Sequence, residues 1–268
     1  MWRRAISFVA VLALRSPTSW ADAGNDPPRM PLKVSMYSGA TEYHSDQSLA
    51  AFRAYLDKNY KVRCTLNDVT DWHALPGVGQ LETCDVIVVF TRRVELPPDQ
   101  VAMVKKYMES GKGVVGIRTA SHAFQTWLAF DHEVLGGDYH NHVKDDKLAR
   151  LTIPAAAKDH PLLAGIEPFT TMGKLYKNPK IAADDTVLLN ARSDDDAEPV
   201  AWARTRKEHH DQRVFYTSLG VPEDFENENF RRMLANAIFW TGKRDSLKLE
   251  TGEDRERGAR GVSSHADQ

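Results

Sequence analysis

The alternation of apolar and amphipathic segments between residues 32 and 117 constrains the fold more than any other feature. Strand-length apolar stretches fall at 32–37, 61–66, 85–90 and 114–117, and helical periodicity marks 45–60 and 97–113. The stretch at 85–90 is continuously apolar, which is typical of a strand covered on both faces. A β-α-β-loop-β-α-β order predicts a parallel, doubly wound sheet with functional groups at the carboxyl ends of its strands.

The second half of the chain has a different pattern. Strand-like stretches at 149–153, 186–190, 199–204 and 213–219 follow one another without long helices between them. A last amphipathic helix is predicted over 228–242, with one apolar face. The expected class is therefore α/β: a mostly parallel sheet flanked by helices, with an added β-rich second half.

The N-terminal residues have the features of a secretory signal peptide. Met1 to Arg4 are positively charged, Ala5 to Leu14 form an apolar run too short to span a bilayer, and Ala21-Asp22-Ala23 is a small-residue cleavage site. We therefore expect residues 1–23 to be cleaved after Ala23 and the protein to be periplasmic or secreted.

The remaining boundaries follow from composition. Residues 24–30 are a proline-containing linker, 31–242 are the folded domain, and 243–268 mix six acidic with six basic side chains without apolar periodicity. Such a tail is expected to be disordered.

Charge and cysteine content exclude several classes of protein. Removing residues 1–23 takes away three arginines and one aspartate, so the formal charge falls from −2 to −4. A mildly acidic chain without a basic stripe is not expected to bind nucleic acid, or a membrane after signal cleavage. Export would permit a disulfide between Cys64 and Cys84, but two separate buried thiols are the simpler expectation.

Three segments place chemistry-bearing side chains where such a sheet would carry a site. The first, residues 38–47, offers Glu42, Tyr43 and His44 just before a predicted helix; alternatively, it is a polar loop that only caps that helix. In the second, residues 113–124, a strand ends at Arg118, Ser121 and His122.

Neighbouring residues such as Ser121 and His122 rarely form a catalytic pair, and the G-x-S-x-G order of a serine hydrolase is absent here. Trp127 follows closely and is a candidate for stacking on a sugar. The densely charged segment 207–212 lies between two strands and is expected to be an exposed hairpin tip outside the site.

The third segment, residues 136–146, carries Asp138, Tyr139, His140 and His142 after two glycines. If it is extended, the two histidines and the aspartate point the same way, which suits a metal ion; if it is a loop, they are hydrogen-bonded polar side chains. We expect no bound metal and no cofactor.

The chain resembles the trehalose-utilisation (ThuA-like) family, whose fold is that of class I glutamine amidotransferases, a flavodoxin-like architecture. The resemblance covers residues 31–242 in order. The pieces that carry it are GKGVVGIRTASHAF, FDHEVLGGDYHNH, DHPLLAGI, EPVAWAR and RVFYTSLGVPEDFENENFRRMLANAIFW.

The sequence departs from the amidotransferases at one decisive position. Their strand ends in a G-x-C-x-G turn that carries the nucleophilic cysteine, whereas this chain has Gly116-Ile117-Arg118-Thr119-Ala120. An arginine stays protonated and cannot replace a thiolate, so glutaminase activity is expected to be absent. Relatives often carry a histidine after the last strand, where this chain has Val221.

The resemblance implies work on carbohydrates. We expect His122, Arg118, His140 and His44 to act in catalysis on a keto-sugar, by isomerisation, epimerisation or elimination, with a sugar oxidoreductase as partner. The expected sugar-binding residues are Glu42, Tyr43, Ser121, Trp127, Asp138, Tyr139 and His142. Two alternatives stay open: a sugar-binding or accessory module without chemistry, and a metal-dependent hydrolase.

Overall fold

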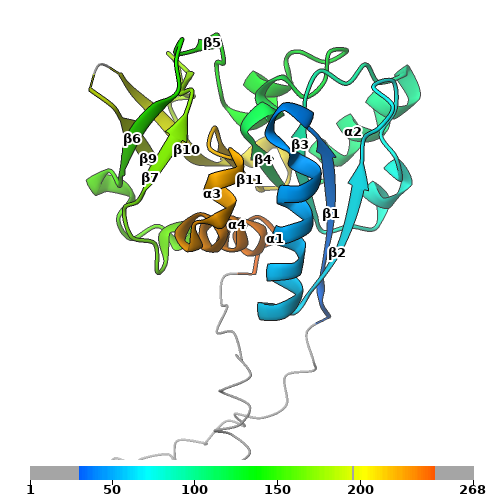
Figure 1. Ribbon diagram of the computed structural model, residues 1–268. Coiled ribbons are helices and arrows are strands. Elements are labelled where there is room, and N and C mark those ends of the chain that lie inside the picture. Colours follow the sequence, from blue (N-terminus) through cyan, green and yellow to red (C-terminus); the bar gives the residue numbers. More distant parts are fainter. Residues whose placement is uncertain (1–29, 195, 245–268) are drawn as a thin grey trace, which may run out of the picture. The chain divides into compact units, whose positions relative to one another are not determined.

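The computed structural model describes residues 30–194 and 196–244 (Figure 1). The expected signal peptide (1–23), nearly all of the expected linker (24–29) and most of the expected tail (245–268) lie outside the described residues. Among the helices of the described part, none has the length and apolar character needed to cross a membrane.

Five parallel strands form one half of the sheet, in the order β2-β1-β3-β4-β11. Four of them come from the first half of the chain, and β11 comes from the second half. The strands are β1 (Leu32–Gly39), β2 (Val62–Asp68), β3 (Val86–Thr91), β4 (Gly113–Ile117) and β11 (Gln212–Thr217). All six residues of β3 are buried, as the continuous apolar run predicts.

The β-rich second half extends the same sheet with antiparallel strands. Beyond β11, the sheet continues in the order β10-β9-β6-β7. These strands are β10 (Ala197–Arg206), β9 (Thr186–Arg192), β6 (Lys147–Thr152) and β7 (Thr170–Gly173). A separate two-stranded pairing joins β5 (Asn141–His142) to β8 (Tyr176–Lys177). The prediction of an α/β sheet with an added β-rich half is confirmed.

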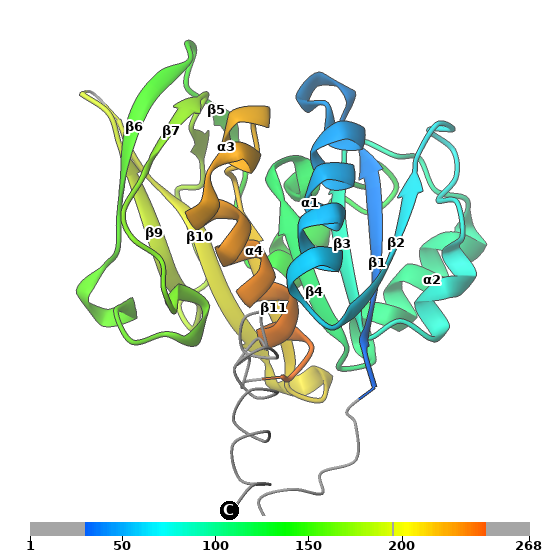
Figure 2. The same cartoon turned by 60° about the horizontal axis from the view of Figure 1, so that its bottom comes forward.

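Helices cover both faces of the parallel strands, which makes the sheet doubly wound (Figure 2). Side chains of α1 (Ser45–Asn59), α3 (Pro222–Glu226) and α4 (Glu228–Thr241) join one core, which includes Met36, Val88 and Ile117. Side chains of α2 (Pro98–Glu109) join the opposite core with Ile87 and Val114. The alternation of side chains along each strand explains why neighbouring strand residues enter different cores.

Short helical turns complete the described part. Turns of 3-10 type cover Thr41–Tyr43, Val78–Glu82, Arg118–His122, Ala155–Ala157, Pro161–Leu163 and Lys207–His209, and a π-type turn covers Asp131–Leu135. The turn at Lys207–His209 joins the antiparallel pair β10 and β11, so the predicted hairpin tip is confirmed.

Both cysteines are buried and free, which confirms the simpler of the two expectations. Burial raises the pKa of the Cys64 thiol to about 12 and that of the Cys84 thiol to about 11. Neither thiol is available as a thiolate near neutral pH, and neither replaces the missing nucleophile.

Candidate functional site

The turn after β4 has the backbone of a nucleophile elbow, but an arginine occupies its apex. Arg118 follows the last strand residue and has a φ of +46°, a conformation that residues other than glycine rarely adopt. The turn is tight, because a Cβ added to Gly116 would lie 3.2 Å from the Cβ of Ala120. The chain therefore keeps the small residues of the elbow while losing its nucleophile.

The Arg118 side chain is enclosed. Only 3% of this residue is exposed, and its guanidinium lies over the ring of Tyr43 at 4.2 Å and over the ring of Tyr176 at 4.8 Å. Its Nη1 donates to the carbonyl of Ser218 at 2.8 Å, and its Nη2 donates to the carbonyl of Lys174 at 3.4 Å. The guanidinium thus joins four segments of the chain and supplies a buried positive charge beneath the strand ends.

The His122 imidazole lies at the end of the elbow turn and has a defined orientation. Its Nδ1 is 3.0 Å from the hydroxyl of Ser121, and its ring stacks on Tyr139 with 4.8 Å between centroids. The Ser121 hydroxyl donates its proton to the carbonyl of Arg118 at 3.4 Å. Nδ1 therefore donates to Ser121 in one tautomer and accepts from it in the other, and Nε2 is an acceptor when the ring proton is on Nδ1.

We use the name edge cluster for Tyr43, Arg118, His122, Tyr139 and Tyr176. Tyr139 and Tyr176 contact each other with 4.6 Å between ring centroids, and each also lies against His122. Tyr176 is almost fully buried, whereas Tyr43, His122 and Tyr139 are partly exposed. The three partly exposed side chains are the ones that a ligand can reach.

The environment of His122 keeps its imidazole neutral. Its pKa is lowered to about 4, first by burial, which removes solvation from the charged form, and then by the positive charges of Arg92, Arg93 and Arg118. Arg92 and Arg93 follow β3, and the Arg93 amide donates to the carbonyl of His122 at 2.8 Å. Near pH 7 the ring is therefore uncharged, and its two nitrogens can donate one hydrogen bond and accept another.

This shift is measurable by NMR. In a titration of the imidazole C–H resonances, we expect His122 to change protonation near pH 4, well below an ordinary histidine. A spectrum of His122→Asn identifies the resonance by its absence. A midpoint between about 6 and 7 would contradict the buried, positively surrounded position described here.

Other predicted site residues do not join one cluster. His44 precedes α1 with a φ of +47° and is exposed, and Glu42 pairs with Arg92 at 3.4 Å. His140 is exposed, and its Nε2 lies 2.9 Å from Asp138 Oδ1. In the part of the chain that the structure describes, no hydrogen bond or ion pair connects His44, His122 and His140. Only His122 lies in the edge cluster.

The row of metal ligands that an extended segment could give does not form. Only Asn141 and His142 of this segment are in a strand, and His142 Nδ1 lies 2.7 Å from the carbonyl of Val143. Over residues 30–194 and 196–244, no three His, Cys, Asp or Glu side chains come together as a set that could hold a metal ion. His140 instead pairs with Asp138, so the interpretation as hydrogen-bonded polar side chains fits this segment better.

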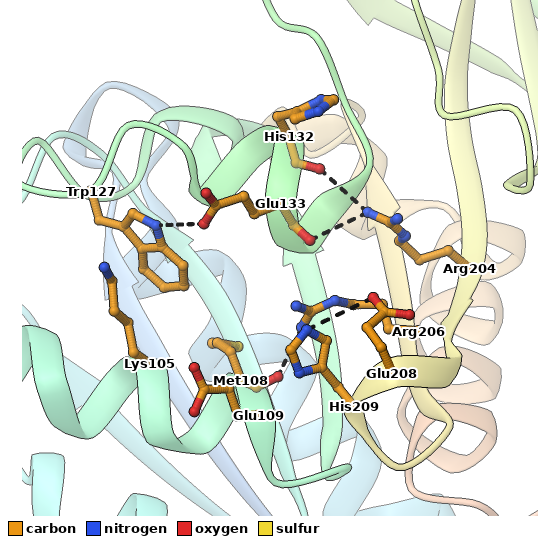
Figure 3. A pocket seen from close by; sticks show the side chains of 10 residues that line it. All are labelled: Lys105, Met108, Glu109, Trp127, His132, Glu133, Arg204, Arg206, Glu208 and His209. Atoms are coloured by element: carbon orange, nitrogen blue, oxygen red, sulfur yellow. Dashed lines mark hydrogen bonds and ion pairs between the residues drawn. The ribbon is translucent and has the colours of Figure 1, made fainter.

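Trp127 lies apart from the edge cluster. Its indole Nε1 donates to Glu133 at 3.0 Å, and the ring lines a separate cavity beside α2 (Figure 3). Trp127 follows His122 by only five residues, which predicts that the two side chains share a site. The structure places the Trp127 ring on the α2 face of the sheet instead, because the chain runs toward that face after the elbow turn.

Sequence reasoning missed three residues that build the site. Tyr176 lies in a two-residue strand with no periodic signal. Asp131 is 7% exposed and its Oδ2 accepts the backbone N–H of Tyr139 at 2.8 Å, which fixes the stacking partner of His122. Asp224 accepts the backbone N–H groups of Gly220 and Val221 at 2.8 and 3.2 Å, and so shapes the loop beside Arg118. Its place in the first turn of a helix that begins with proline was the available signal.

The fold and this site define a doubly wound α/β protein that carries an arginine in the tight turn after β4. A sequence model of the family described as trehalose utilisation (ThuA) matches residues 33–241. The chain belongs to this family, as its motifs indicate.

Two solved structures share this fold. A ThuA-like protein from Bacteroides uniformis has 18% identity and a TM-score of 0.62, with coverage of 81% of this chain and 94% of that one. A ThuA-like protein from Parabacteroides merdae has 15% identity and a TM-score of 0.63, with coverage of 79% and 90%. No curated protein matches the chain.

Proposed function

We propose that this protein binds a sugar that carries a ketone at the edge cluster, and that His122 removes a proton from the carbon next to that ketone. The observation that carries the proposal is the neutral imidazole of His122, which contacts Ser121 and stacks on Tyr139. In the tautomer with the ring proton on Nδ1, Nε2 is free to accept a proton. Half-buried aromatic rings beside it offer an apolar surface for a sugar ring.

The proposed step makes an enolate from the ketone. Nε2 of His122 takes the proton, the C–H electron pair forms a C=C bond to the carbonyl carbon, and the C=O π pair moves onto the oxygen. Because the deprotonated carbon carries a hydroxyl group, the product is the anion of an enediol. The nearby charges of Arg92, Arg93 and Arg118 favour that anion over the neutral ketone. Protonation of the same carbon by solvent from the other face gives an epimer. Protonation of the former carbonyl carbon, with loss of the proton of the other enediol hydroxyl, gives an isomer. Departure of an oxygen substituent from the next carbon, which takes the C–O pair and a proton from His122 or solvent, gives elimination.

The family's description, trehalose utilisation, supports a carbohydrate as the substrate. A ring ketone on a sugar is made by oxidation, so the proposal includes a sugar oxidoreductase as the partner that supplies the substrate. It also includes export to the periplasm or medium through residues 1–23, on the sequence features described above.

A second candidate is a sugar-binding module without chemistry. Two observations favour it: the Arg118 N–H groups contact main-chain carbonyls, and no carboxylate in the described part of the chain is hydrogen-bonded to His122. Both candidate functions use the edge cluster, so both predict that the sugar binds there. Only the enzyme also predicts that the bound sugar is converted to a product.

Calorimetric titration with a disaccharide that carries one ring ketone tests the binding step. We expect the protein to bind it, and Tyr139→Leu to weaken binding by about threefold to tenfold through loss of the aromatic surface. Tyr55→Leu changes a partly buried tyrosine of α1 whose ring packs on Phe52 and Tyr60 and not on the edge cluster, so it is the matched control and should bind as the wild type does. Absence of binding to the wild-type protein, or equal affinity of the Tyr139 variant, would overturn the site.

A further inference from the structure

A cavity lies on the α2 face of the sheet, away from the edge cluster (Figure 3). It measures about 410 Å³, is open to solvent on one side, and is lined by residues of α2, the turn at Asp131–Leu135, the end of β10 and the hairpin tip that follows it. Its volume is within the range of about 300 to 1,000 Å³ found for small-molecule sites. None of the edge cluster residues lines it.

Trp127 forms an aromatic wall of this cavity with a fixed orientation. Its Nε1 donates to Glu133 Oε2 at 3.0 Å, and Lys105 Nζ lies 5.1 Å from the ring centroid. Figure 3 shows the indole, Lys105 and Glu133 on the same side of the cavity. Because Lys105 is exposed and flexible, its ammonium can move aside and open the indole face to a ligand.

The Arg206 guanidinium is only partly paired within the protein. The residue is 6% exposed, and its Nη1 donates to the carbonyl of Met108 at 2.8 Å and to Gln212 Oε1 at 2.5 Å. Its Nε is buried and makes no hydrogen bond with any residue that the structure describes. A buried N–H of this kind costs free energy unless water or a ligand supplies an acceptor.

The charges that line the cavity are balanced. Three basic side chains and three acidic ones contribute to it: Lys105, Arg204 and Arg206, and Glu109, Glu133 and Glu208. Among the described residues, the exposed carboxylate of Glu109 has no hydrogen bond or ion pair. A balanced lining selects neither an anion nor a cation, but offers donors and acceptors together beside an aromatic wall.

We propose that this cavity is a second binding site, for a neutral saccharide, with the sugar ring against Trp127 and its hydroxyl groups between the Arg206 guanidinium and the Glu109 carboxylate. A polyhydroxylated ring matches the lining because each hydroxyl both donates and accepts, and the C–H face of the ring packs on the indole. This inference does not depend on the function proposed for the edge cluster.

Calorimetry and ligand-detected NMR on the full chain, with glucose, maltose and trehalose as probes, test this site. We expect at least one of these sugars to bind. Glu109→Gln should weaken binding about tenfold, the loss typical of one hydrogen bond to a charged group, and Trp127→Ala should weaken it about tenfold through loss of the aromatic surface. Glu167→Gln, an exposed glutamate outside the cavity, is the matched control. Sodium gluconate and glucosamine should bind more weakly than the neutral sugars.

The same titration on His122→Asn separates this site from the edge cluster. Binding of the neutral sugar should be unchanged by that substitution if it occurs in the α2 cavity. Glu109→Gln changes only an exposed side chain, so it keeps the test valid if Trp127→Ala is unstable. The proposal is overturned if none of the three sugars binds, if Glu109→Gln binds as the wild type does, or if gluconate binds best.

Discussion

Asp224→Ala is expected to lower the free energy of unfolding by about 3 to 5 kcal/mol, because three buried donors lose their acceptor together. Asp224 is 3% exposed and accepts from Gly220 N, Val221 N and, at 2.7 Å, Thr171 Oγ1. Urea unfolding followed by circular dichroism measures the change.

Two further variants make this result specific. Glu223→Ala alters the neighbouring, exposed residue of α3 and should change stability by less than about 0.5 kcal/mol. Asp224→Asn keeps one acceptor oxygen and should fall between the wild type and the alanine variant. A loss below about 1 kcal/mol for Asp224→Ala would show that the loop after β11 does not depend on this carboxylate.

The second large effect concerns the proposed proton transfer. With a ring-ketone disaccharide in D₂O, the wild-type protein should exchange the hydrogen on the carbon next to the ketone for deuterium. His122→Asn should slow this exchange by about 100-fold to 10,000-fold, the usual contribution of a positioned general base. The asparagine amide can still donate to Ser121, so the change removes the base while the local hydrogen bond remains possible.

His73→Asn is the matched control, because His73 is an exposed histidine whose Nδ1 pairs with Glu95 at 3.5 Å. It should exchange deuterium at the wild-type rate. Binding of the ketone by the wild type without exchange would leave the sugar-binding module as the function. Equal rates for wild type and His122→Asn would remove His122 from the chemistry.

Much of the fold was predictable because its signals are local. The apolar run at 85–90 and the helical periodicity at 45–60 each indicate one element, and the order of such elements fixes a doubly wound sheet. The G-x-R-x-A sequence at 116–120 also located the elbow, since the small residues at both ends are what the tight turn requires. The antiparallel extension was less defined, because strands that pair across long connections leave no local sign of their order.

The site was only partly predictable, because its contacts join residues far apart in the chain. Arg118 lies between Tyr43 and Tyr176, which are separated from each other by more than half of the described chain, and no pattern links them. Three histidines at strand ends suggested one centre. In the structure His140 pairs with Asp138, and His44 is exposed. Residues at the ends of different strands need not meet, because the carboxyl edge of the sheet is wider than a single ligand.

A crystal structure of the protein with the ring-ketone disaccharide bound tests the central claim most directly. The account predicts the sugar at the edge cluster, with the carbon next to the ketone about 3 to 3.5 Å from His122 Nε2. A sugar bound with that carbon turned away from His122, or found only in the cavity beside α2, would contradict it.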